Sequence, residues 1–334
     1  MEVVCIGGRK LGEFATPQVV VSKCLEFDAC RYNGEMIPNK TIQRLSSFVN
    51  FIPVCPEVEI GLGVPRDTIR LVDNNGSKEL IQPSTKKNIT GEMHKFSERF
   101  IKSLQEVDGF LLKNRSPTCG ISDAKVYTGA EKGSATKELG SGLFAEAVLS
   151  HFSGCAVEDE GRLSNFTIRE HFYTKIFTLA AFKEKKRTQK IHELVNFHAR
   201  QKFLLMAYDQ KSVKELGNIA ANHERLPAER VFEKYEAALK HALQQAPSTK
   251  RYINVCEHVF GFLSSGLHAG EKAFFLDMLE RYREKKIPLT SITSILKSWA
   301  VRFEEAYLLR QSFFLPYPEE LVEISDSGKG RAYT

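Results

Sequence analysis

Short apolar runs, separated by turns and by one amphipathic stretch, make up the N-terminal part of the chain. The runs at 19–25, 51–55 and 109–113 end in polar or Pro-containing segments, which predicts buried strands. Apolar residues at helical spacing over 92–107 predict a helix between the last two of them. The segment 71–82 turns at Asn-Asn-Gly and is either a hairpin or an excursion. Buried strands that alternate with helices predict a small parallel α/β sheet, with the functional site beyond the carboxyl ends of its strands.

From about residue 165 onwards the pattern changes to helical periodicity, and strand patterns almost vanish. We interpret the acidic stretch at 158–163 as the junction. A chain of 334 residues is also longer than one core usually fills. We therefore expect an α/β domain over 1–164, followed by an all-α helical domain over 165–334. The predicted helical segments are 167–182, 188–207, 211–222, 228–245, 250–264, 268–285 and 290–314.

The composition narrows the class of protein. Hydrophobic residues make up 42% of the chain and charged residues 26%, which is typical of a globular protein and excludes a disordered or fibrous one. No apolar run approaches the roughly 18 residues that a membrane span needs. Residues 1–9 lack the pattern of a signal peptide. We expect a soluble, cytoplasmic protein with no membrane partner and no obligate protein partner.

Seven cysteines, an odd number in a long chain of this class, argue against a disulfide framework. They are buried apolar residues, reactive thiols or metal ligands. Cys24, Cys55 and Cys119 each lie at, or a few residues beyond, the end of a predicted strand. Because these ends converge in a parallel sheet, we expect the three thiols to meet at one edge.

Three thiolates at one point suit a soft metal centre. A structural zinc site would need a fourth Cys or His, usually in close pairs, and the sequence has no CxxC pair. A 4Fe-4S cluster held by three thiolates leaves one iron open for chemistry. A cysteine near a strand end is nevertheless most often a small buried apolar residue, so both interpretations stay open. Cys30, six residues from Cys24, is a further candidate ligand.

Several long motifs occur in order along the chain. They are Ser22-Lys23-Cys24-Leu25, Cys30-Arg31-Tyr32-Asn33-Gly34, the segments 54–66 and 113–120, and in the second half 194–207, 254–258 and 282–289. The motifs of the first half resemble the thiouracil desulfidase family. The second half resembles the helical domain of unknown function that is often fused to it, and the fused form is similar to bacterial desulfidases that remove sulfur from 4-thiouridine in tRNA. The resemblance covers nearly the whole chain after residue 18.

The resemblance implies a 4Fe-4S cluster on Cys24, Cys55 and Cys119. It also implies a catalytic glutamate, Glu57, and a catalytic serine, Ser116. The open iron would bind the sulfur of a thiolated uracil, and Glu57 would act as general base and then general acid while water replaces sulfur without net redox change.

Two arginines near these motifs have alternative interpretations. Arg66 and Arg70 either hold the acidic loop or bind a phosphate or the uracil carbonyl. Two features depart from the family pattern. Glu26, with Phe27, stands where Leu-Gly is more frequent, which could alter the floor of the pocket. Gln201 stands where a second histidine is common, which could weaken an RNA contact.

The basic excess of the chain falls in its second half. Residues 165–334 carry 27 Lys and Arg against 20 Asp and Glu, within a total net charge of +6. Such residues can neutralise phosphates without reading sequence, so we expect tRNA as a partner, with Phe182, Phe197 and His198 available for stacking on a base. A solvated helix face is the ordinary alternative. The expected RNA-binding residues are Lys183, Lys185, Lys186, Arg187, Lys190, His198, Arg200 and Lys202.

Three functions are therefore compatible with the sequence. The first is a 4Fe-4S-dependent desulfidase that converts 4-thiouridine in tRNA to uridine and sulfide. The second is a desulfidase of free 2-thiouracil or thionucleosides. The third is a non-catalytic RNA-binding protein with a structural metal or none. The sequence leaves open the oligomeric state and whether Cys30 contacts the metal.

Overall fold

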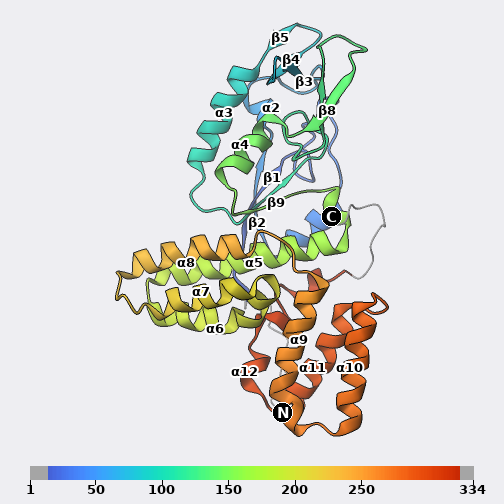
Figure 1. Ribbon diagram of the computed structural model, residues 1–334. Coiled ribbons are helices and arrows are strands. Elements are labelled where there is room, and N and C mark those ends of the chain that lie inside the picture. The colour runs from blue at the N-terminus through green and yellow to red at the C-terminus, as the bar shows by residue number, and fades with distance from the viewer. Residues whose placement is uncertain (1–13, 324–334) are drawn as a thin grey trace. The chain divides into compact units, whose positions relative to one another are not determined.

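The computed structural model describes residues 14–323 (Figure 1), so the N-terminal residues inspected for a signal peptide lie outside it. The described residues form two compact units. The α/β unit comprises Thr16–Ile176 and Glu323, and the helical unit comprises Phe177–Val322 with Phe14 and Ala15. The units divide within helix α5 (Phe166–Thr188), whereas the sequence placed the boundary at residue 164. The predicted fold class, an α/β region followed by a helical one, is confirmed.

A four-stranded parallel sheet forms the centre of the α/β unit, in the order β2-β1-β6-β9. Its strands are β1 (Gln18–Ser22), β2 (Asn50–Val54), β6 (Gly109–Leu112) and β9 (Ala156–Asp159). Val20 of β1 pairs with Ile52 on one side and with Phe110 on the other. Strands β1 and β6 are almost fully buried, as their continuous apolar runs predict for central parallel strands. The three predicted strands are confirmed, and β9 is an additional one.

Besides the first half of α5, this unit contains α1 (Lys40–Leu45), α2 (Pro56–Glu59), α3 (Thr90–Ser103) and α4 (Leu143–His151). The predicted helix over 92–107 corresponds to α3. Phe96 of α3 and Phe144 of α4 belong to one buried cluster with Phe110 of β6. Each such side chain contributes roughly 1.5–3 kcal/mol through removal of its apolar surface from water. This packing fixes the sheet whose strand ends carry the candidate site.

A second sheet has the order β5-β4-β3-β7-β8 and lies outside the sequence prediction apart from its hairpin. Strands β3 (Arg70–Asn74) and β4 (Ser77–Gln82) are antiparallel around the Asn75-Gly76 turn, so the hairpin alternative for 71–82 is confirmed. The other strands are β5 (Lys87–Asn88), β7 (Ala124–Tyr127) and β8 (Thr136–Gly140). Of the strand pairings described in this sheet, the one between β3 and β7 is parallel and the others are antiparallel.

The helical unit continues from α5 through seven further helices. Their bounds are α6 (Ile191–Tyr208), α7 (Gln210–Ala221), α8 (Ala228–Ala242), α9 (Thr249–Leu263), α10 (Ala269–Arg283), α11 (Leu289–Arg302) and α12 (Ala306–Leu309). The run predicted as one helix over 290–314 is interrupted at 303–305, where Glu304 adopts a left-handed conformation with φ 55°. Short 3-10 turns occupy Arg162–Ser164, Ser264–Gly266, Ser312–Phe314 and Glu319–Leu321.

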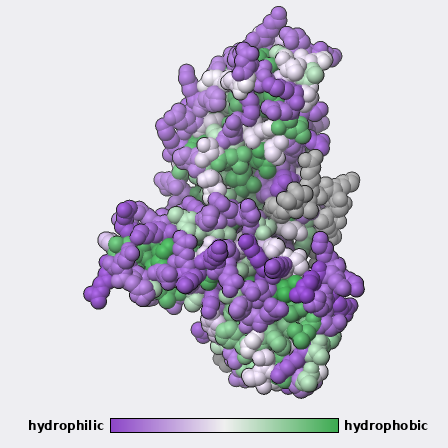
Figure 2. Space-filling model, in the orientation of Figure 1, coloured by the Kyte–Doolittle hydropathy of each residue, from purple (hydrophilic) through white to green (hydrophobic). Residues whose placement is uncertain are grey.

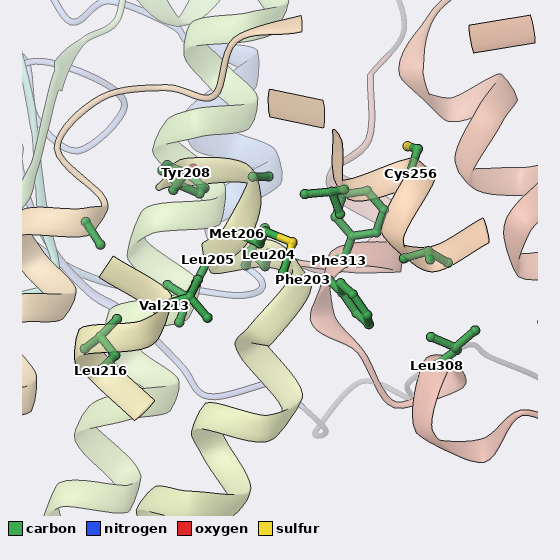
Figure 3. Packing of buried hydrophobic residues seen from close by; sticks show 14 of the residues in the cluster. Phe203, Leu204, Leu205, Met206, Tyr208, Val213, Leu216, Cys256, Leu308 and Phe313 are labelled. Carbon is green, nitrogen blue, oxygen red and sulfur yellow. The ribbon is translucent and has the colours of Figure 1, made fainter. Parts of the chain in front are cut away.

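One hydrophobic core holds the helical unit together. Figure 3 shows part of it, where Phe203, Leu204 and Met206 of α6 lie near Phe313, which follows α12 in the chain. Within residues 14–323, no helix combines the length and the apolarity that a membrane crossing requires.

Candidate functional site

A cavity of about 400 Å³ opens beyond the carboxyl ends of β1, β2 and β6. Residues that end or directly follow these strands, among them Ser22, Val54 and Lys113, line it. The structure thus brings the candidate residues of the α/β unit into one cavity, as convergence of parallel strand ends requires. The thiols and the candidate catalytic residues in its wall are Cys24, Cys30, Cys55, Cys119, Glu57 and Ser116.

Each candidate ligand is held by the backbone around it. Cys24 follows β1 by two residues, and the preceding amide of Lys23 donates to the carbonyl of Val54 in β2 at 2.8 Å. Cys55 comes directly after β2 and occupies the N-cap position of α2. Cys119 lies in the turn after β6, where its amide donates to the Ser116 hydroxyl oxygen at 3.0 Å. Local backbone structure, rather than side-chain contacts alone, therefore fixes the three positions.

Burial controls the chemistry of these thiols. Burial, together with the smaller contribution of the neighbouring Cys55, raises the pKa of Cys24 to about 12. Burial also raises the pKa of Cys30 to about 12 and the pKa of Cys119 well above its usual value. A bound metal centre reverses this preference, because its positive charge deprotonates the thiols that coordinate it. The soft, buried donor set therefore fits an iron–sulfur group, which supplies that charge.

The spacing of these thiols differs from that of a site for one metal ion. In the part of the chain that the structure describes, no three His, Cys, Asp or Glu side chains lie close enough to hold a single ion. A cluster does not need such close spacing, because each thiolate binds a different iron. Cys30 is a fourth thiol in the same wall, and its carbonyl accepts a hydrogen bond from the Cys55 thiol at 3.8 Å.

Glu57 is held on both of its carboxylate oxygens. Arg66 donates to Oε2 from Nε at 2.9 Å and from Nη2 at 2.7 Å, and Thr118 donates its hydroxyl to Oε1 at 3.0 Å. The Arg66 side chain is 3% exposed and that of Glu57 14% exposed. Of the two functions open to Arg66, the structure shows that it holds the acidic loop. Arg70 instead stacks on Tyr127 and is not part of the cavity wall.

Ser116 organises the turn that carries Cys119. Its hydroxyl oxygen accepts the amides of Thr118 at 3.1 Å and of Cys119 at 3.0 Å. A serine hydroxyl has two acceptor lone pairs and one donor proton, so only the proton remains for a ligand. Close packing behind the turn requires glycine at Gly142, where a Cβ atom would lie 2.5 Å from the carbonyl carbon of Thr118.

Thr118 is a residue of the site that sequence reasoning missed. It is fully buried, and it connects the two candidate catalytic groups through its hydroxyl and its amide. The only signal for it in the sequence is a hydroxyl side chain beside Cys119 in the Ser-Pro-Thr-Cys turn. Such a residue is common in turns, so its partner across the cavity became visible only in the folded chain.

The two departures from the family pattern lie away from the cavity wall. Glu26 adopts φ 71° and accepts a hydrogen bond from Gln43 at 3.1 Å, so its carboxylate is directed to α1 and not to the pocket floor. Gln201 is buried in the helical unit and accepts the hydroxyl of Ser312 at 2.5 Å. It therefore contributes to packing inside that unit.

The expected RNA-binding residues lie at the end of α5, in the linker after it and on α6. Lys185 pairs with Glu193 at 3.1 Å, and Lys186 pairs with Glu236 at 2.6 Å. Neighbouring carboxylates therefore neutralise part of the charge. Arg187, Lys190 and Arg200 are exposed, whereas Lys183 and Lys202 are partly buried. Hydrophilic residues cover much of the visible surface of both units (Figure 2), so polarity alone does not single out this face.

Two of the three expected stacking residues, Phe182 and Phe197, are not available to a base. Phe182 and Phe197 are buried, and each packs against Tyr235 in the core of the helical unit, so that expectation was wrong. The physical reason is that a helix with a basic face still needs an apolar face towards its neighbours. His198 is half-buried, and its Nδ1 lies 3.0 Å from the hydroxyl of Tyr235. Burial lowers the pKa of His198, which favours the neutral ring.

Comparisons with known proteins agree with the motifs. Residues 19–160 match the family described as 2-thiouracil desulfurase, and residues 202–318 match the family described as a protein of unknown function (DUF1722). The resemblance of both parts of the chain is therefore confirmed.

Three individual proteins are similar to parts of the chain. The uncharacterized protein YbbK of Bacillus subtilis (strain 168) is 27% identical over 156 residues, 44% of this chain and 98% of YbbK. The uncharacterized protein YbgA of Escherichia coli (strain K12) is 22% identical over 136 residues, 40% of this chain and 80% of YbgA. A solved structure titled 4Fe-4S-dependent thiouracil desulfidase TudS is 26% identical, with a TM-score of 0.35, covering 44% of this chain and 93% of its own.

Proposed function

We propose, from the match of residues 19–160 to the 2-thiouracil desulfurase family, that this protein is a 4Fe-4S-dependent desulfidase of thiolated uracil. We propose 4-thiouridine in tRNA as its substrate, with uridine and sulfide as the products. The observation that carries the proposal is the convergence of three thiols, one carboxylate and one hydroxyl on a single cavity at the sheet edge.

In this proposal Cys24, Cys55 and Cys119 hold the cluster. When bound, the cluster supplies an iron that attracts the soft thiocarbonyl sulfur and withdraws electrons from the C–S bond. The residues of the chain supply the remaining chemistry. Cys55 and Cys119 are buried and Cys24 is partly buried in the cavity wall, so the site takes the thiocarbonyl group away from bulk water.

Glu57 is the proposed general base. It accepts a proton from the water that attacks the carbon bearing sulfur, and it returns the proton as the C–S bond breaks. One water is consumed, one oxygen replaces one sulfur, and sulfide leaves with both protons of the water as H₂S. No electron is gained or lost, so the reaction needs no reductant. The polar contacts of Glu57 with Arg66 and Thr118 fix its carboxylate for this transfer.

Ser116 is the proposed donor towards the base. Both of its acceptor positions are used by backbone amides, and among residues 14–323 no acceptor takes its hydroxyl proton. It is therefore suited to donate to a carbonyl of the uracil ring, and it is unsuited to accept a proton. Ser116 is thus a proposed hydrogen-bond donor, whereas Glu57 is the proposed proton acceptor.

The tRNA assignment is supported by the charge of the second half. The basic residues at the end of α5 and on α6 provide a field that favours a polyanion. Because a base within folded tRNA is stacked, it would have to leave its stack to enter the cavity. The alternative substrates, free 2-thiouracil and thionucleosides, require no such surface.

The test is anaerobic reconstitution of the full chain with iron and sulfide, followed by incubation with thiolated tRNA, 4-thiouridine or 2-thiouracil. We expect a brown protein that releases sulfide from thiolated tRNA at a rate that falls steeply with salt. Release from the free bases alone would contradict the tRNA assignment. A colourless protein with full activity, or a brown protein inactive on every substrate, would contradict the desulfidase assignment.

Three ligand variants and one control variant sharpen this test. We expect Ser in place of Cys24, Cys55 or Cys119 to abolish sulfide release. Ala in place of Cys256, a buried thiol in α9 of the helical unit, should leave it intact.

A further inference from the structure

Arg66 uses every donor of its guanidinium group inside the protein. Its Nε and one Nη2 hydrogen are directed to Oε2 of Glu57, and its Nη1 donates to the carbonyls of Cys30 and Gly63, both at 2.9 Å. The second Nη2 hydrogen faces the Sγ atom of Cys55 at 4.0 Å. Because the side chain is almost fully buried and all five N–H groups have acceptors, the guanidinium group is held in a single orientation.

The two oxygens of Glu57 consequently differ. A carboxylate oxygen has about two lone-pair positions, and both on Oε2 are directed to Arg66. Oε1 accepts one hydrogen bond, from the hydroxyl of Thr118 at 3.0 Å, and it has one position left. A water that gives up a proton to Glu57 can therefore approach only Oε1.

Thr118 is fixed by both of its main-chain polar groups. Its amide donates to the Ser116 hydroxyl oxygen at 3.1 Å, and its carbonyl accepts the amide of Ala145 in the first turn of α4 at 3.0 Å. Its hydroxyl therefore reaches Oε1 from a turn that cannot shift independently of Ser116 and Cys119. Thr118 thus sets the distance between the proposed base and the proposed donor.

We infer that Arg66 and Thr118 are positioning residues for Glu57, and that together they assign the proton transfer to Oε1. This inference rests on the proposed desulfidase function. Arg66 acts by filling Oε2, and Thr118 acts by orienting Oε1 towards the attacking water. Neither residue exchanges a proton with the substrate.

The decisive variant is Thr118→Val, which keeps the size, the branching and the amide of the residue and removes only the hydroxyl. We expect kcat to fall about 10- to 100-fold, with KM changed by less than about threefold, because a misdirected base affects the chemical step and not binding. The solvent deuterium isotope effect on kcat should rise as proton transfer becomes slower. Thr118→Ser, which restores the hydroxyl, should recover most of the rate.

Three measurements keep the outcome interpretable. Iron and sulfide content and visible absorbance of each variant should equal those of the unmodified protein, and each variant should stay folded at the assay temperature, so that a loss of rate is not a loss of cluster or fold. In a Glu57→Gln background, Thr118→Val should not lower kcat any further, because Thr118 acts through Glu57.

Arg66→Lys, which keeps the charge and loses the paired donation to Oε2, should lower kcat in the same way as Thr118→Val does.

The possible results distinguish a failure of the positioning inference from a failure of the proposed desulfidase function. If Glu57→Gln strongly lowers the rate and Thr118→Val turns over like the unmodified protein, the positioning inference is wrong and the desulfidase assignment stands. The same holds if Thr118→Ser is as slow as Thr118→Val. If Glu57→Gln keeps full activity, or if the loaded unmodified protein releases no sulfide, the proposed function itself is wrong.

Discussion

The cavity of the α/β unit and the basic surface of the helical unit both carry charge, but they hold it differently. In the cavity, the Arg66 side chain is almost fully buried, the Glu57 side chain is 14% exposed, and every guanidinium donor has an acceptor. On the helical unit, Lys186 pairs with Glu236 with both side chains partly exposed to water. A buried charge is confined to one geometry, whereas an exposed one contributes to a field that salt screens. The comparison teaches that the proposed catalytic cavity depends on one fixed charge geometry, whereas the proposed tRNA-binding surface depends on a field that salt weakens.

The largest effect that tests this comparison is loss of a proposed cluster ligand. We expect Cys55→Ser to lower iron content to background and sulfide release by more than about 100-fold, because two thiolates cannot replace three. Iron analysis and visible absorbance after anaerobic reconstitution measure it. Cys155→Ala, at a buried thiol that does not line the cavity, is the control and should retain both. A fully loaded Cys55→Ser protein would remove this residue from the ligand set.

Removal of Arg66 should produce the next largest effect. Arg66→Ala leaves the half-buried Glu57 carboxylate without its ion-pair partner, which should lower the free energy of unfolding by about 3 kcal/mol. Urea denaturation of the cluster-free protein measures the change. Lys102→Ala breaks an ion pair with Glu98 that is exposed on α3, and it should change stability very little. Equal effects of the two variants would contradict the distinction between buried and exposed charge.

A buried carboxyl provides a smaller effect that depends on pH. Burial raises the pKa of Asp159 from 3.8 to about 6. The folded protein therefore keeps this proton at pH values where the unfolded chain releases it, so stability falls as pH rises from about 4 to about 6. Asp159→Asn should remove this part of the pH dependence, about 2 kcal/mol across the range. Urea midpoints at pH 4.5 and 6.5 measure it, and an unchanged difference between them would contradict the assignment.

The smallest effects are expected on the basic surface. Lys190→Ala and Arg200→Ala, at exposed residues, should each weaken tRNA binding about three- to tenfold and reduce the slope of log affinity against log salt by about one. Lys186→Ala should do less, because Glu236 already neutralises that charge. Filter binding over a salt series measures the slopes. Slopes that do not change in any variant would exclude this face as the tRNA-binding surface.

The sequence predicted the strands that carry the cysteines, because continuous apolar runs such as 109–113 mark central parallel strands. It did not predict β8, whose residues are mostly exposed and polar, so that no alternation marks them. It also treated the acidic stretch after Ala156 as a junction. There Glu158 and Asp159 are buried in β9, and only the folded chain supplies the partners that make this possible.

The sequence was sufficient to predict which residues form the candidate site. It was not sufficient to predict the hydrogen bonds that connect them. Convergence of strand ends placed Cys24, Cys55 and Cys119 together, since the edge of a parallel sheet follows from topology. The hydrogen bond from Thr118 to Glu57 joins residues 61 positions apart and depends on how two turns face each other. Periodicity contains no information on such a contact.

The close packing that glycine allows at residue 142 has a consequence for amide hydrogen exchange when the cavity binds iron. The amide of Gly142 donates to the carbonyl of Gly120, and the amides of Leu143 and Ala145 in the first turn of α4 donate to the carbonyls of Pro117 and Thr118. The start of this helix is therefore hydrogen-bonded directly to the loop that bears Cys119. Uptake of iron at the cavity should therefore slow hydrogen exchange at the amides of 142–145. Hydrogen exchange at these amides would therefore measure how much of the protein has bound iron, without substrate and without an added label.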